Sequence, residues 1–141
     1  MIVKRVMAAL AASALLYSCS TTRVSDLTAS DVPPERIYQD SFVSTDEDPA
    51  RLVFIRDKGL TGSACKVNLY VNGRRAFSMG TAEKTIVEVD PGEYVLRLEF
   101  GVSTFCPDEY QTKEINLKPG EERRYRFSMS GNFNIGFTRE L

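Results

Sequence analysis

The chain has 141 residues, of which 43% are hydrophobic and 26% are charged, and its 18 basic side chains are nearly balanced by 19 acidic ones. This length suits one domain with a core of its own, and a chain without a basic excess lacks the surface that nucleic-acid binding requires. The sequence contains no histidine, which argues against the usual general base, the Ser-His and Cys-His nucleophile systems and the commonest zinc ligand. We therefore expect a protein that is not an enzyme, with no cofactor, no metal ion and no nucleic-acid partner.

The N-terminus has the pattern of a bacterial lipoprotein signal. Two basic residues, Lys4 and Arg5, precede an apolar run over residues 6–16, and Cys19 follows shortly after it. The run has the length of a signal-peptide core and is too short to span a bilayer of roughly 30 Å as a helix. In such signals the cysteine thiolate is the nucleophile that takes up the lipid before the preceding peptide bond is cut. The pattern predicts a lipoprotein signal peptide over residues 1–18 and lipidation of Cys19, the alternatives being an ordinary signal peptide or an uncleaved anchor.

Residues 19–49 are expected to form the lipidated N-terminus and a flexible tether. They are mostly small and polar, with an acidic run at 45–49, and such a composition buries too little apolar surface to fold by itself. About 30 residues of flexible chain would let the domain range roughly 30 Å from the membrane. The apolar pairs Ile37-Tyr38 and Phe42-Val43 are exceptions, and they favour a short strand lying against the domain.

From residue 50 onward the sequence predicts β-strands. Residues 52–55 are apolar on both faces of a strand, which is typical of a central strand, and residues 67–71 alternate between apolar and polar. Asn72-Gly73 follows at once and favours the positive φ angles of a tight hairpin turn. The return strand is therefore expected over residues 74–79.

The same alternation continues towards the C-terminus. Pro91-Gly92 and Pro119-Gly120 indicate two turns, because proline fixes one φ angle and glycine permits the other. Alternating apolar residues predict further strands at 85–89, 94–100, 115–117, 124–129 and 133–137. Roughly seven or eight short strands with frequent turn signals are typical of a sandwich. We therefore predict an all-β domain over residues 50–141, an immunoglobulin-like or transthyretin-like β-sandwich.

Cys65 and Cys106 are a candidate disulfide pair. An exported chain enters an oxidising compartment, and these two cysteines remain when Cys19 is assigned to the lipid. The chain-entropy model gives a bridge between them about 4 kcal/mol of stabilisation. The alternative is two separate buried thiols.

Three motifs resemble the bacterial lipoproteins grouped as domain of unknown function 2846. They are Arg-Leu-Val-Phe-Ile-Arg at 51–56, Val-Asn-Leu-Tyr-Val-Asn-Gly-Arg at 67–74 and Val-Asp-Pro-Gly-Glu-Tyr at 89–94. The second half also resembles the carboxypeptidase-regulatory and PEGA-type surface domains, which share the Pro-Gly-Glu-Tyr turn. The resemblance covers roughly residues 50–127. It implies a small β-sandwich on the cell envelope, with no activity and no catalytic residues to carry over.

Two groups of residues are candidate binding sites. The first is a glycine-rich loop, in which backbone amides and hydroxyls would hold a polar ligand; the alternative is a loop that only turns a corner. It contains Gly59, Thr61, Gly62 and Ser63. The second is the pair Arg124 and Arg126, which share one face of a predicted strand and would meet an anionic partner. The alternative there is a solvated face that also protects a sheet edge.

These features predict a non-catalytic lipoprotein of the bacterial envelope, attached to the membrane through its N-terminal lipid and binding another envelope protein or a surface polymer. Ser20 follows the cysteine where enteric bacteria use aspartate to retain lipoproteins at the inner membrane, so the outer membrane is the expected location. The alternative is a structural lipoprotein subunit of a secretion apparatus, because the outer-membrane lipoproteins of type VI secretion also pair a lipid anchor with a transthyretin-like sandwich.

Overall fold

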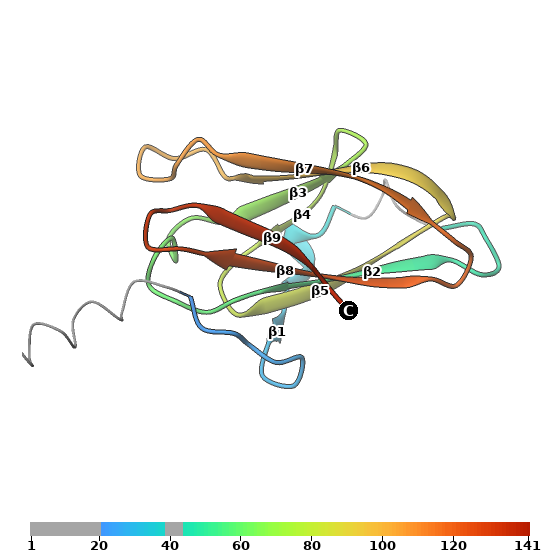
Figure 1. Cartoon of the computed structure of the whole chain (residues 1–141), viewed down its shortest axis with the longest axis horizontal. Helices are drawn as coiled ribbons and strands as arrows, with labels where there is room; N and C mark the ends of the chain where they lie inside the picture. The colour runs from blue at the N-terminus through green and yellow to red at the C-terminus, as the bar shows by residue number, and fades with distance from the viewer. Residues whose placement is uncertain (1–20, 39–43) are drawn as a thin grey trace, which may run out of the picture.

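The computed structural model describes residues 21–38 and 44–141, and this part of the chain forms nine strands in two stacked sheets (Figure 1). One sheet has the strand order β1-β5-β2-β8-β9 and the other has the order β4-β3-β6-β7. The elements are β1 (Ser30–Asp31), the 3-10 turn η2 (Pro34–Arg36), β2 (Ala50–Arg56), β3 (Val67–Val71), β4 (Arg74–Met79), β5 (Glu83–Val89), β6 (Gly92–Phe100), β7 (Tyr110–Leu117), β8 (Glu122–Met129) and β9 (Ile135–Glu140). The prediction of an all-β sandwich is confirmed.

Strand β2 lies at the centre of the five-stranded sheet, as its apolar sequence predicts. It pairs with β5 in antiparallel and with β8 in parallel orientation. Leu52 and Phe54 belong to the core between the sheets, whereas Val53 and Ile55 are buried outside that core cluster. Because neighbouring side chains of a strand point to opposite faces, the outer face of this sheet is covered as well.

The hairpin between β3 and β4 turns at Asn72-Gly73, as predicted, with φ angles of 48° and 78°. The pairing register shifts between Leu69 and Tyr70. The resulting β-bulge allows Ala76 and Phe77 both to be buried, although they are neighbours in one strand.

A cluster of aromatic rings fills the core between the sheets. Phe54 of β2 lies at its centre, with ring centroids 5.2 Å from Phe77 on the facing sheet and 5.7 Å from Tyr125 on the neighbouring strand. Phe137 of β9 packs against Tyr125 and Phe127 at 5.1 and 5.3 Å. Burial of each large apolar side chain contributes roughly 1.5–3 kcal/mol. Because the rings come from strands of both sheets, the cluster joins the sheets into one core.

Residues 21–38 lie against the sandwich, which corrects the expectation that they belong to a flexible tether. Val24 and Val32 are buried, and the backbone of β1 pairs in parallel with β5. In Figure 1 the first part of this segment, drawn in blue, runs along the outer side of the five-stranded sheet. The composition of the segment is polar, but two well-placed apolar side chains and a set of backbone hydrogen bonds are sufficient to dock it.

The end of this segment meets the edge of the other sheet. A bridge joins Ile37 to Phe77 of β4, and the Tyr38 N–H donates to the Ala76 carbonyl at 2.8 Å. The predicted contact of Ile37-Tyr38 with the domain is therefore confirmed. Phe42-Val43, the signal peptide and Cys19 lie outside the described residues.

The sandwich has two distinct ends (Figure 1). At the end that we call the loop end, the β2–β3, β4–β5, β6–β7 and β8–β9 connections cluster; they span residues 57–66, 80–82, 101–109 and 130–134. At the opposite end, the turn end, lie residues 44–49 and the tight β3–β4, β5–β6 and β7–β8 turns.

Candidate functional site

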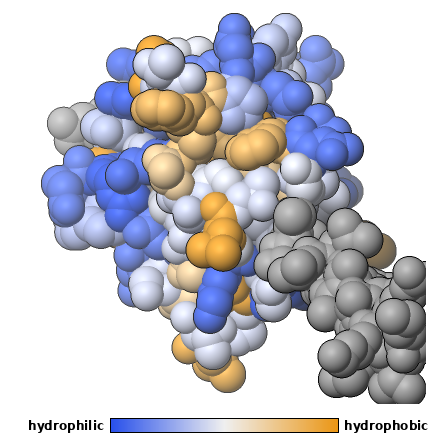
Figure 2. Space-filling model, turned by 90° about the vertical axis from the view of Figure 1, so that its left-hand side faces the viewer, coloured by the Kyte–Doolittle hydropathy of each residue, from blue (hydrophilic) through white to orange (hydrophobic). Residues whose placement is uncertain are grey.

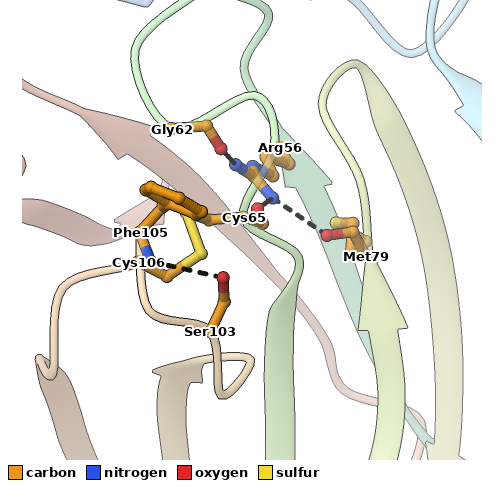
Figure 3. Close-up of a disulfide and its surroundings, with 7 residues drawn as sticks. All are labelled: Arg56, Gly62, Cys65, Met79, Ser103, Phe105 and Cys106. Carbon is orange, nitrogen blue, oxygen red and sulfur yellow. Dashed lines mark hydrogen bonds between the residues drawn. A yellow bond between two sulfur atoms is a disulfide. The ribbon is translucent and has the colours of Figure 1, made fainter.

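The predicted disulfide is present and ties the loop end together. Cys65 of the β2–β3 loop is bonded to Cys106 of the β6–β7 loop, with their Cα atoms 5.6 Å apart (Figure 3). Cys65 is buried, and Cys106 packs against the core. The β2–β3 loop crosses from one sheet to the other, so the bridge fixes this crossing to a loop of the four-stranded sheet.

Arg56 is a buried cation beneath the same loop, and sequence reasoning missed its role. One guanidinium nitrogen donates to the carbonyls of Cys65 at 2.6 Å and Met79 at 2.9 Å, and another donates to the Gly62 carbonyl at 2.9 Å (Figure 3). Burial lowers the pKa of Arg56 to about 10, so it remains charged at neutral pH. The available signal was the two-residue period of β2, which places position 56 on the inward face shared by Leu52 and Phe54.

The candidate ligand loop is part of this packed structure. Gly62 has a φ of 69°, and a Cβ atom there would clash with the Met129 side chain. Gly59 lies against Thr21, Thr61 is half-buried, and the Ser63 N–H donates to the Leu60 carbonyl at 3.0 Å. The structure thus brings the four predicted residues together, and close packing accounts for both glycines.

Arg126 is not available to an anionic partner, which corrects the expectation for this face. Its side chain is 8% exposed and donates to Asp57 at 2.5 Å, to Glu140 at 2.7 Å and to the Val24 carbonyl at 2.9 Å. The hydrogen bond that Arg126 donates to Glu140 lowers the pKa of the Glu140 carboxyl group. The buried arginine therefore docks the N-terminal segment on the outer face of the sheet.

Arg124, the second residue of the predicted anionic-partner face, is also matched by carboxylates. It forms ion pairs with Asp26 of the N-terminal segment and, at 3.3 Å, with Glu122 of its own strand. The predicted alternation of β8 was correct, because Arg124 and Arg126 do share a face. What the pattern did not reveal is that acidic residues from distant positions in the chain cover that face.

The N-terminal segment reaches the loop end at its first described residues. The Thr21 hydroxyl accepts from the Met129 N–H at 3.0 Å, and the Thr21 N–H donates to the Met129 carbonyl at 3.2 Å. Thr22 and Lys58 exchange backbone hydrogen bonds of 2.6 and 3.0 Å. Position 21 is thereby held beside the β2–β3 and β8–β9 loops, two residues after Cys19 in the sequence.

The loop end also exposes large apolar side chains. We call this group the loop-end patch, and it consists of Leu60, Val102, Phe105 and Phe133. Leu60 is 84% and Phe105 88% exposed, Val102 is fully exposed, and Phe133 is 45% exposed. Figure 2 views the molecule from this end and shows hydrophobic surface gathered there among hydrophilic side chains. Exposed apolar patches of this kind mark contact surfaces for membranes or other proteins.

Over residues 21–38 and 44–141, no group of three or more His, Cys, Asp or Glu side chains is placed to hold a metal ion. In the same ranges, none of the helical structure has the length and hydrophobicity needed to cross a bilayer. Within the acidic residues at 46–48, an Asp46 carboxylate oxygen accepts from the Asp48 N–H at 2.9 Å.

No family model matches this sequence, and no curated protein matches it either. The resemblance to the lipoproteins of domain of unknown function 2846 therefore stays a prediction. The features that bear on function are those of the molecule itself: the docked N-terminal segment, the disulfide-tied loops and the loop-end patch.

Proposed function

We propose that this chain is a non-catalytic lipoprotein of the bacterial envelope, anchored in the outer membrane through Cys19, whose sandwich binds another envelope protein or a surface polymer. The lipoprotein signal at residues 1–19 and the Cys65–Cys106 disulfide, which suits an exported protein, support the proposal. We further propose that the sandwich is of the immunoglobulin-like or transthyretin-like type.

One observation carries the proposal furthest, namely the position of Thr21. It is hydrogen-bonded to Met129 at the loop end and follows Cys19 by only two residues. Two residues span at most about 7 Å, so a lipid on Cys19 would hold the loop end close to the membrane surface. The domain would then keep one orientation, in place of the roughly 30 Å range that a flexible tether would allow.

This orientation directs the turn end away from the membrane. The turn end carries exposed acidic residues at 46–48 and the tight Asn72-Gly73 hairpin. Loops and sheet edges are the surfaces through which sandwiches recognise partners. We therefore place the contact with an envelope protein or polymer on the turn end and the adjoining strand edges.

The anchor is tested by expressing the full chain and its Cys19→Ala variant in a bacterial host with radiolabelled palmitate. Labelling and membrane fractionation are expected for the native chain and lost in the variant, while Ser20→Ala, as the matched control, keeps the label. Density-gradient separation of the two membranes then checks the outer-membrane assignment. Labelling of the Cys19→Ala chain at the native level would overturn the anchor.

The binding role is tested by crosslinking intact envelopes and identifying the molecules attached to the domain. A partner that crosslinks through probes at the turn end, and not through probes at the loop end, is expected. Screening of the domain against hydrolase substrates is expected to show no turnover. A reproducible activity that is lost on changing a single polar residue would contradict the non-catalytic assignment.

A further inference from the structure

We propose that the loop-end patch inserts into the interfacial layer of the bilayer that carries the Cys19 lipid, so that the domain has a second, protein-made contact with the membrane. This inference rests on the lipid-anchored location proposed above. The occupant of the patch is thus the phospholipid surface itself.

The patch collects apolar side chains from three separate loops. Leu60 lies on the β2–β3 loop, Val102 and Phe105 on the β6–β7 loop, and Phe133 on the β8–β9 loop. Among the described residues, segment 44–49 and the three tight turns contain no exposed large hydrophobic residue, and Val95 of β6, beside the Asn72-Gly73 turn, is 43% exposed. In the part of the chain that the structure describes, the loop end groups the most large, exposed apolar side chains, which suits a domain lying on a membrane because burial of apolar side chains away from water is favourable.

The chain itself indicates that the membrane covers this patch. The hydrogen bonds of Thr21 to Met129 fix the N-terminal segment at the loop end, and the lipidated residue would be within about 7 Å of it along the chain. An anchor at that point brings the adjoining loops to the bilayer surface without any partner protein. Apolar side chains that leave water next to an anchor add their own transfer free energy to membrane binding.

The loops that carry the patch are held in place before they meet the membrane. Cys65–Cys106 joins the β2–β3 and β6–β7 loops, and Arg56 holds the first of them through the carbonyls of Gly62 and Cys65. A surface that is already ordered loses little conformational entropy when it binds. The disulfide and the buried arginine therefore present Leu60 and Phe105 as fixed contacts.

Phe133 gives an independent indication that the patch has a role outside folding. Its φ angle is 62°, in the left-handed region that favours glycine or asparagine and that is uncommon for a bulky residue. Its N–H closes the β8–β9 turn on the Ser130 carbonyl at 3.0 Å. Glycine would satisfy this backbone without strain, so the ring at this position is explained by what it contacts and not by the turn.

The test uses the absence of tryptophan from the chain, which makes any introduced tryptophan a unique fluorophore. Phe105→Trp places it in the loop-end patch, and Glu47→Trp places it at the exposed turn end as the matched control. Both variants are expressed from the full chain, purified with their lipid from bacterial membranes and reconstituted into vesicles of phosphatidylethanolamine and phosphatidylglycerol, with or without brominated acyl chains. Brominated chains quench only a fluorophore that enters the bilayer.

We expect blue-shifted emission and quenching that is several-fold stronger for Phe105→Trp than for Glu47→Trp. Adding Phe133→Gly to Phe105→Trp is expected to weaken the quenching without lowering the thermal midpoint, because glycine fits the turn. Solvent-like emission from Phe105→Trp, with quenching equal to that of Glu47→Trp, would overturn the inference. A fall in the thermal midpoint without a change in quenching would assign Phe133 to the fold and contradict its part in the patch.

The anchor and the patch can fail separately. Intact mass of the purified protein reports whether an acyl group is present, which tests the proposed location. If none is present, the chain from Cys19 onward is coupled to vesicles through a maleimide headgroup, because Cys65 and Cys106 are bonded and Cys19 is the third of three cysteines. Quenching of Phe105→Trp in this arm supports the patch, and its absence rejects it, whatever the native anchor.

Discussion

The loop end and the turn end of the sandwich differ both in how they are held and in what they expose. The turn end uses tight turns, such as Asn72-Gly73 with its two positive φ angles, and its exposed residues at 46–48 are acidic. The loop end has two long loops, 57–66 and 101–109, that are fixed by a disulfide and a buried arginine. It exposes four large apolar side chains.

The two ends differ in whether local or distant residues hold their connections in place. A short turn needs only local residues of the right conformation. The loop end needs long-range supports, since Arg56 and Met79 lie 23 positions apart and Cys65 and Cys106 lie 41 apart. Long-range supports and an exposed apolar surface at the same end are the features on which the proposed membrane contact rests.

Removing the disulfide is expected to have the largest effect on this contrast. Replacing Cys65 and Cys106 together by alanine should lower the free energy of unfolding by roughly 4 kcal/mol, because the closed loop is long. Urea denaturation measures the loss, and reductant should lower the stability of the native chain while leaving the double variant unchanged. A loss below about 1 kcal/mol would show that the loop end is held mainly by other contacts.

Removing the buried arginine should have the next largest effect. Arg56→Met keeps much of the side-chain length but leaves the carbonyls of Cys65, Gly62 and Met79 without this donor, which should cost about 3 kcal/mol. Arg51→Met at the start of the same strand is the control. Its ion pairs are exposed, so less than about 1 kcal/mol should be lost. Equal losses by chemical denaturation would contradict the support assigned to Arg56.

A smaller, pH-dependent effect on stability is expected at the place where the N-terminal segment docks on the five-stranded sheet. The hydrogen bond from Arg126 lowers the pKa of Glu140 in the folded state, so its contribution is present above the unfolded pKa and is lost as pH falls through the folded value. Glu140→Gln should therefore lower stability at pH 7 by roughly 1–2 kcal/mol. The difference from the native chain should shrink as the pH falls below about 4.

Unfolding monitored across this pH range checks the prediction. Glu88→Gln is the matched control, because Glu88 is exposed and lies 3.6 Å from Arg51 in a surface pair. It should change stability little at any pH. A Glu140→Gln difference that persists undiminished in acid would show that the residue acts through packing and not through its charge.

Much of the fold could be predicted because its signals are local. The alternation of strands, the Asn72-Gly73 hairpin and the cysteine pair each depend on neighbouring residues or on compartment chemistry, and all three agree with the structure. The predicted strand at 133–137 began too early, because Phe133 lies in the turn with a positive φ. Its alternation with Ile135 and Phe137 had made it look like a core residue.

The candidate site was less predictable because it depends on contacts between distant segments. Arg126 is 69 positions from Asp57 and 102 from Val24, and no local pattern shows that these residues meet. The same holds for Thr21 and Met129, which lie 108 positions apart. A polar N-terminal composition predicted a tether, but a few long-range hydrogen bonds and two buried valines were enough to dock it.

The parallel pairing of β2 with β8 has a consequence for the order in which the chain would fold during the export proposed above. A chain that crosses a membrane from its N-terminus presents β2 early, but the second neighbour of β2 arrives only with residues 122–129. Cys106 emerges before that strand, so oxidation of the Cys65–Cys106 pair can precede closure of the five-stranded sheet. Such non-local pairing forms slowly. Until β8 pairs with β2 and completes the core, the disulfide would restrict the conformations of the partly folded chain.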